Sequence, residues 1–191
     1  LLEISQALGA GLNLRASIAS VLERLAEAQH LISAVVFLKD DSGTGLRVEA
    51  ATGAALAARH AKFRVGEGIT GQVVRTGRPV VVPRVSREPL FLDRSGVFKR
   101  SGRSELSFIC VPVKSAGRTV GALGVVLPFH AQRNYEPEVK FYGVVASMVG
   151  QAERTHGLIE ADRRRLVDEN TQLRQELRER YDLHNIVGSS R

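Results

Sequence analysis

Three glycines, at positions 66, 68 and 71, form the pattern in this chain that could most directly do chemistry, because they spell Gly-x-Gly-x-x-Gly. In dinucleotide-binding folds such a turn follows a buried parallel strand and brings the backbone close to a pyrophosphate. Here a short basic stretch, 62–65, precedes the glycines, and the next apolar run ends at Pro83 without an acidic residue for a ribose. We therefore interpret the glycines as a tight turn that opens a helix over 69–75.

Histidine and cysteine give no sign of catalysis. The five histidines, at positions 30, 60, 130, 156 and 184, are scattered and have no cysteine or carboxylate at metal-ligand spacing. The single Cys110 excludes an intramolecular disulfide and matches a reducing compartment, with a redox-sensor role as the open alternative. The sequence therefore predicts a binding or regulatory module without a metal, and not an enzyme.

Basic residues are concentrated in the middle of the chain. The whole sequence has a net charge of +7, and residues 59–118 contain 13 basic and 4 acidic groups. Such a surplus fits a pocket for an anion, a nucleic-acid contact or an ordinary solvated surface. Part of it lies in the stretch 84–104, which also contains Leu90, Phe91, Leu92 and Phe98. Because long loops are commonly functional and this one has apolar anchors, we expect an ordered functional loop there.

These groups must be positioned by a mixed set of helices and strands. Residues 1–29 have a helical spacing of apolar groups, interrupted at Gly9 and Gly11, with Asn13 as the expected cap of a second helix. The elements expected after it are a hairpin of 31–38 and 46–50, a short helix at 54–60, a strand at 80–82 and a hairpin of 106–113 and 119–127.

The last hairpin is apolar on both faces. In its first strand, one face presents Leu106, Phe108, Cys110 and Pro112, and the other presents Ile109, Val111 and Val113. We therefore expect this hairpin at the centre of the sheet, with helices on at least one side.

A long helix is predicted from Pro137 to Tyr181. A heptad frame with Leu166 at d gives a seam that consists of Val149, Ala152, Ile159, Leu166, Asn170, Leu173 and Leu177. Asn170 lies at an a position, where a polar residue fixes the register of two-stranded coils. The frame predicts a parallel homodimer, which His156 and Arg163 at other a positions weaken. The alternative is a helix that docks on its own domain.

The composition is that of a globular domain with an extension, with 43% apolar and 25% charged residues. No apolar run reaches the roughly 18–20 residues that span a bilayer, and the start of the chain lacks the features of a signal peptide. We therefore expect a cytoplasmic location without membrane contact.

Taken in order, the expected elements resemble the GAF family over residues 1–152. The resemblance rests on the Gly-Glu-Gly-Ile-Thr-Gly helix start, the Pro-Val-Val-Val-Pro strand, the long loop and the hairpin with Val-Pro-Val. The phrases at 63–71, 77–83, 88–94 and 107–113 look more narrowly like the sensory domain of NifA-like (NifA, AnfA, VnfA) sigma-54-dependent activators of nitrogen-fixation genes. Residues 180–190 look like the start of the AAA+ domain of such activators.

The resemblance implies an α+β (α/β/α) fold, in which a central antiparallel sheet is flanked by helices and followed by a long C-terminal linker helix. It implies a sensory domain at 1–152, a coiled-coil signalling linker at 153–182 and the truncated start of the AAA+ domain at 183–191. A methionine sulfoxide reductase of the GAF family would need several catalytic cysteines, and this chain has one.

The resemblance also implies a pocket between the sheet and the segment 84–104, with 2-oxoglutarate as a candidate effector. A buried dicarboxylate needs cationic donors to offset its desolvation. The candidate ligand-binding residues are Arg84, Phe91, Arg94, Lys99, Arg100, Arg103, Phe108 and Cys110. A NifL-like inhibitory partner is implied too, as is contact of the full-length protein with sigma-54 RNA polymerase and DNA through domains beyond residue 191. The alternative is a GAF module that acts only as a docking and dimerisation surface.

Overall fold

One six-stranded antiparallel sheet organises the first part of the chain. The computed structural model describes residues 13–56, 61–93, 96 and 105–187, and the chain divides into two units between Arg154 and Thr155. The strands lie in the order β3-β2-β1-β6-β5-β4, and each neighbouring pair is antiparallel. Their bounds are β1 Ser33–Lys39, β2 Gly45–Gly53, β3 Phe63–Arg64, β4 Val80–Val82, β5 Leu106–Ser115 and β6 Arg118–Pro128.

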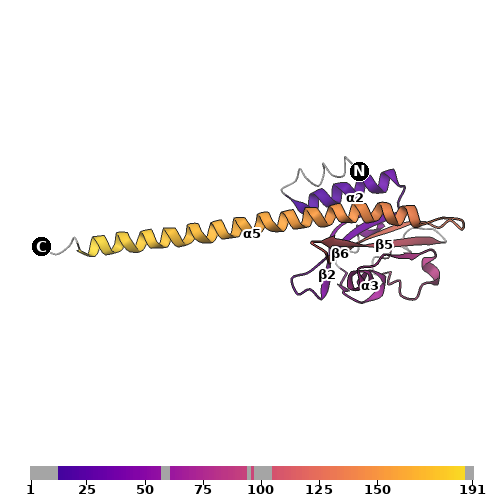
Figure 1. Ribbon diagram of the computed structural model, residues 1–191, viewed down its shortest axis with the longest axis horizontal. Helices are drawn as coiled ribbons and strands as arrows, with labels where there is room; N and C mark the ends of the chain where they lie inside the picture. Colours follow the sequence, from indigo (N-terminus) through magenta and orange to yellow (C-terminus); the bar gives the residue numbers. More distant parts are fainter. Residues whose placement is uncertain (1–12, 57–60, 94–95, 97–104, 188–191) are drawn as a thin grey trace. The chain divides into compact units, whose positions relative to one another are not determined.

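Helices cover both faces of this sheet. Helix α2 (Leu14–Ala28) and the first part of α5 (Glu136–Val187) lie on one face, and α3 (Gly68–Thr76) lies on the other (Figure 1). A short 3-10 helix, η2 (Val85–Arg87), follows β4. The predicted α+β arrangement with a flanked central antiparallel sheet is therefore confirmed.

Each face of the sheet has its own hydrophobic core. Strand β5 contributes Ile109, Val111 and Val113 to the core under α2 and α5. The alternate residues Phe108 and Cys110 belong to the core under α3. The two-faced pattern predicted for this strand is confirmed, since successive side chains of a strand point to opposite faces.

The start of α2 is fixed by Asn13, as predicted. Its side-chain oxygen accepts a hydrogen bond from the Ala16 amide at 3.2 Å, which satisfies one of the free donors of the first turn. The helix expected at 54–60 appears within the described residues as a 3-10 turn at 54–56. Residues 57–60 and the expected first helix, 1–12, lie outside the described residues.

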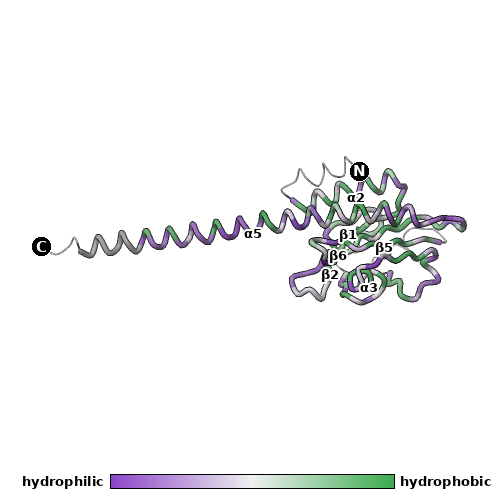
Figure 2. The backbone as a smooth tube through the Cα atoms, in the orientation of Figure 1, coloured by the Kyte–Doolittle hydropathy of each residue, from purple (hydrophilic) through white to green (hydrophobic). Residues whose placement is uncertain are grey.

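Helix α5 begins with Glu136 and Glu138, whose charges suit the positive end of the helix dipole. It passes without a break through Gly143, Gly150 and Gly157. In the second unit the helix is mainly hydrophilic, with hydrophobic residues at intervals (Figure 2). None of the helices in the described residues is long and apolar enough to cross a membrane.

Candidate functional site

The glycine turn before α3 is a structural device. The Gly66 amide donates to the Gly71 carbonyl at 2.8 Å, and Gly66 and Gly68 adopt φ of +87° and +60°, which favour glycine. A side chain at Gly71 would collide with the backbone of Arg64 and Gly66. A dinucleotide-binding turn joins parallel strands, whereas each strand pairing described here is antiparallel. The glycines thus place the start of α3 against the sheet.

Under α3, an apolar hollow lies between the sheet and the segment that follows β4. Its volume is about 30 Å³, and it is lined by Phe63, Glu67, Gly68, Ile69, Thr70, Phe91, Leu92 and Phe108. Such a volume is on the order of one or two water molecules. The ring of the half-buried Phe91 contacts that of Phe108 edge to face, with centroids 5.2 Å apart. The structure therefore brings together two of the predicted site residues, and both line this small hollow.

Glycine at position 124 makes room for the Phe108 ring. An added Cβ at Gly124 would lie 3.0 Å from two atoms of that ring, closer than ordinary van der Waals contact. The sequence analysis did not single out this glycine, although a glycine inside an apolar strand is a signal for close approach. The wall of the hollow thus depends on β6 as well as on β5.

Cys110 lies on the same face of β5 as Phe108 and is fully buried. Burial raises the pKa of its thiol to about 12, and a hydrogen bond with the Thr70 side chain opposes that shift. A neutral thiol is a poor nucleophile and a poor target for oxidants. Cys110 is therefore an unreactive residue of the core under α3 and does not line the hollow, and Thr70 is a partner that sequence reasoning missed.

One further polar group on this face was missed. Ser33 pairs with Val126, which pairs with Phe108, so the three side chains lie in one row on the same face. Ser33 is 1% exposed, and among the described residues its hydroxyl is the buried side-chain group that has no hydrogen-bond partner. A lone serine in the apolar run 31–38 was the available signal.

The basic candidates lie apart from this hollow or outside the described residues. Arg84 stacks on the ring of Phe129 at 4.4 Å and interacts electrostatically with Glu105. Arg94, Lys99, Arg100 and Arg103 lie outside the described residues. Phe91, Phe108 and Cys110 therefore form the described part of the predicted site.

Glu105 joins the two ends of the segment that carries Phe91. Its carboxylate accepts a hydrogen bond from the Ser86 hydroxyl at 2.7 Å. That bond is the main reason why the pKa of Glu105 is lowered, and the charge of Arg84 adds to it. Two residues further along the chain, in β5, the Ser107 hydroxyl donates to the Pro83 carbonyl at 2.7 Å. These contacts hold the base of the segment against β5.

The opposite face of β5 supports the helix that leaves the domain. Val111 and Val113 pack in one core with Tyr142, Val145 and Val149 of α5. Strand β5 therefore contacts the hollow on one face and α5 on the other.

The backbone of α5 also approaches the end of β5 closely. A Cβ at Gly150 would overlap the Lys114 carbonyl, whose carbon would lie 2.8 Å away. Since only glycine leaves that space free, helix and strand are in backbone contact at this point.

The predicted helix seam has two parts. Val149 is fully buried in the core under α2 and α5, and Ala152 is half-buried, so these two positions lie within the first unit. Further along, Ile159, Leu166, Leu173 and Leu177 are between 53% and 56% exposed. Leu158 and Val167, which lie outside the predicted seam, are 63% and 58% exposed, so exposure alone does not distinguish the seam.

The sheet order, the two helical layers and the glycine turn define the chain as a GAF domain by its fold. A family model described as "GAF domain" matches residues 12–152, and the chain belongs to this family. The solved GAF domain of A. aeolicus nlh2, in an inactive state, is 22% identical, with a TM-score of 0.71 over 81% of this chain and 93% of that one. The free methionine-R-sulfoxide reductase of Neisseria meningitidis is 24% identical, with a TM-score of 0.69 over 83% and 88%. Both likenesses show the fold.

Among curated proteins, the chain is similar to regulators of nitrogen fixation. It is 36% identical to the Nif-specific regulatory protein of Azospirillum brasilense over 92% of this chain and 28% of that protein. The corresponding protein of Herbaspirillum seropedicae is 34% identical over 99% and 35%. Nitrogen fixation protein AnfA of Azotobacter vinelandii is 33% identical over 68% and 24%. The chain thus spans about a quarter to a third of the length of these relatives.

Proposed function

We propose that this GAF domain is the regulatory sensor of a transcription activator of nitrogen-fixation genes. In this proposal an effector bound on the α3 face controls an AAA+ ATPase that follows the linker helix and acts on sigma-54 RNA polymerase. The similarity to Nif-specific regulatory proteins supports the biological context. The observation that carries the proposal is β5, because this one strand contacts both the hollow and α5.

The proposed effector is a small molecule held between the sheet and the segment 84–104. Phe91 and Phe108 would supply its apolar contacts, with Cys110 behind them, and 2-oxoglutarate is the first candidate. The hollow of about 30 Å³ is too small for such a molecule. In this proposal the ligand displaces Phe91 from Phe108, and this movement couples the ligand to β5.

Thermal denaturation of the 191-residue chain with 2-oxoglutarate, cyclic nucleotides and other small acids tests the effector. We expect one of these compounds to raise the midpoint of unfolding, since a ligand that binds only the folded state stabilises it. The Phe108→Leu variant should lose the shift but stay folded, whereas Leu56→Ala, at a 47% exposed residue outside the hollow, should keep it. If no compound raises the midpoint, effector sensing is refuted.

The proposed output is a homodimer formed through α5. The seam would comprise Ile159, Leu166, Asn170, Leu173 and Leu177, with Val149 and Ala152 at its start. Glu169 at g and Arg174 at e are placed to attract each other across a parallel pair. Sedimentation of the wild-type chain should give a dimer, and Leu166→Glu should give a monomer. The matched variant Ala161→Glu, on the far side of the helix, should remain a dimer. A wild-type monomer at tens of micromolar would contradict this output.

A second candidate function is a docking surface for an inhibitory protein of the NifL type. Leu90 and Leu92 favour it, since they are 53% and 42% exposed beside the half-buried Phe91. Because Leu92 also lines the hollow, the variant for this test is Leu90→Ser, which should abolish partner binding and leave the effector shift intact. Loss of the effector shift alone would instead place Leu90 in the sensor mechanism.

A further inference from the structure

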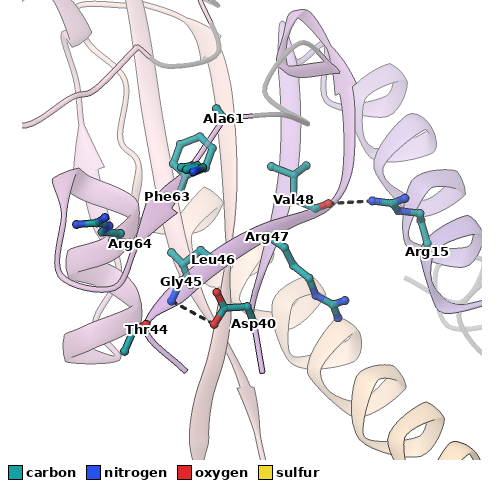
Figure 3. Close-up of a pocket in the computed structure, with 11 residues that line it drawn as sticks. Arg15, Asp40, Thr44, Gly45, Leu46, Arg47, Val48, Ala61, Phe63 and Arg64 are labelled. Atoms are coloured by element: carbon teal, nitrogen blue, oxygen red, sulfur yellow. Dashed lines mark hydrogen bonds between the residues drawn. The ribbon is translucent and has the colours of Figure 1, made fainter. Parts of the chain in front are cut away.

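A second and much larger hollow lies at the edge of the sheet, where β3 pairs with β2 at two positions, Gly45 with Arg64 and Leu46 with Phe63. Its volume is about 490 Å³. Four cations line it, one from α2, one from β2 and two from the stretch 61–64: Arg15, Arg47, Lys62 and Arg64. Figure 3 shows three of them, Arg15, Arg47 and Arg64. One carboxylate, Asp40, also lies in the lining.

Three of these charged groups surround Gly45 at the end of β2. Arg47 pairs with Leu38, whose side chain belongs to the core under α2 and α5. Residues two apart on a strand share a face, so Gly45 lies on this face too, and Arg64 is its partner in β3. In Figure 3, Arg47 and Arg64 lie on either side of Asp40. Gly45 adds no side chain, and an added Cβ there would collide with the Asp40 carboxylate.

Arg15 is held in position by the open edge of β2. Its Nε donates to the Glu49 carbonyl at 2.8 Å, and its Nη2 donates to the Val48 carbonyl at 3.2 Å. A guanidinium has five N–H donors in a rigid plane, so donors remain after these two bonds. A cation that is already ordered loses less conformational entropy when it binds an anion.

The acidic groups around the hollow do not cancel its positive charge. Asp40 accepts hydrogen bonds from the Ser42 hydroxyl at 2.6 Å and from the Gly45 amide at 3.2 Å. The Ser42 bond is the main reason why the pKa of Asp40 is lowered. Glu49 pairs with Arg47 at 3.2 Å. Glu67 lines an adjoining hollow together with Lys62 and Arg64. Four cations against these three carboxylates leave a surplus of one positive charge.

The two hollows differ in the ligand that their chemistry suits. The hollow under α3 is apolar, has a volume of about 30 Å³, and has one charged lining residue among those described, the acidic Glu67. The edge hollow is more than ten times larger and basic. Phe63 lines both and packs edge to face on Phe37, with centroids 4.7 Å apart.

We infer that the edge hollow binds a compact multivalent anion, a small molecule with two or more phosphate or carboxylate groups. Arg15 supplies the preordered donor, and Arg47 and Arg64 supply charge on either side. We infer a multivalent anion because its cationic partners come from three separate elements, α2, β2 and β3. This site is distinct from the proposed effector pocket and does not depend on it.

Titration calorimetry of the 191-residue chain with tripolyphosphate and with citrate tests the inference. Sodium chloride at matched ionic strength controls for screening, which is strong at exposed charges. We expect at least one anion to bind and its affinity to fall at least tenfold in Arg64→Gln, which is about 1.4 kcal/mol. Tighter binding of tripolyphosphate assigns the site to phosphate esters, and tighter binding of citrate assigns it to carboxylates.

Three further variants make the result decisive. Arg64→Gln is the primary variant because the Arg64 side chain is exposed. Arg47→Gln also removes the ion-pair partner of Glu49, so its thermal midpoint must be measured to separate a loss of affinity from a loss of stability. Arg118→Gln, an equal loss of charge at an exposed residue of the β5–β6 hairpin, should keep full affinity. Phe91→Ala should also keep it. The inference is overturned if neither anion binds, or if Arg118→Gln lowers the affinity as much as Arg64→Gln does. It is also overturned if the affinity depends on Phe91 and not on Arg64, because the anion would then bind in the effector pocket.

Discussion

Substituting Gly150 by alanine tests whether the backbone contact between α5 and β5 holds the domain together. At this position an added Cβ would overlap the Lys114 carbonyl oxygen, and its distance to the carbonyl carbon would be 2.8 Å, against 3.4 Å for ordinary contact. The obstacle is backbone on both sides, so relief requires the helix and the strand to separate. The core under α2 and α5 would then lose its close packing, since Tyr142 and Val149 are fully buried there.

The expected magnitude combines two opposing effects. Overpacking of a well-packed core costs about 1–3 kcal/mol, and a clash with backbone belongs at the upper end of that range. Alanine in place of glycine inside a helix contributes about 1 kcal/mol in the other direction. Gly150→Ala should therefore lower the free energy of unfolding by about 2 kcal/mol. Gly143→Ala, in the same helix with nothing within 4 Å of the added Cβ, should raise it by about 1 kcal/mol.

Urea denaturation followed by circular dichroism measures both variants on the same footing. A change of midpoint at constant slope reports a change of stability alone. The two substitutions are chemically identical and lie seven residues apart, so helix propensity contributes equally to both. The reasoning is refuted if Gly150→Ala is as stabilising as Gly143→Ala.

Three further predictions concern the hollow, the buried thiol and the segment base. Phe108→Ala should lower the free energy of unfolding by about 3–5 kcal/mol, and Phe91→Ala should lower it by less because Phe91 is only half-buried. Equal losses of the two variants in urea denaturation would contradict the packing described here. Because burial raises the pKa of Cys110 from 9.0 to about 12, the folded thiol stays protonated where the unfolded thiol ionises, so stability is lost as pH rises from 9 toward 12. Cys110→Ala should flatten this alkaline slope, part of which comes from Tyr142 with its pKa raised to about 12. The lowered pKa of Glu105 gives the opposite pH dependence: a small stabilisation is present above the unfolded pKa of about 4.5 and is lost on acidification. Ser86→Ala should reduce this stabilisation, which thermal midpoints measured from pH 3 to 7 would show.

Local and periodic features of the fold were predictable from the sequence. Asn13 as a helix cap, the two faces of β5 and the helix after the glycine turn each depend on residues within a few positions of one another. The strand boundaries were less predictable, since β1 begins at Ser33 and not at residue 31. The kind of turn at 54–56 was missed, because an alanine-rich stretch has the same composition in a 3-10 turn as in a helix.

The candidate site was predictable in its walls but not in its charges. Phe91 and Phe108 stood out as apolar residues in a long loop and a central strand, and the structure places their rings in contact. Arg84 was expected near the ligand, yet its guanidinium stacks on Phe129, a residue 45 positions later that no spacing rule connects to it. The edge hollow could not be predicted from the sequence for the same reason. Arg15 and Arg64 are far apart in the chain and line one hollow only because β2 pairs with β3 and α2 packs on the sheet.

The second-unit part of α5, from Thr155 to Val187, has 33 residues, which corresponds to a length of about 50 Å at 1.5 Å per residue. A continuous helix fixes both the distance and the rotational angle between the residues at its two ends. Each inserted residue rotates everything beyond it by about 100°, whereas seven residues restore the direction to within about 20°. A series of insertions in this stretch would therefore show whether the signal depends on distance or on angular phase, since distance grows steadily while phase repeats with the heptad.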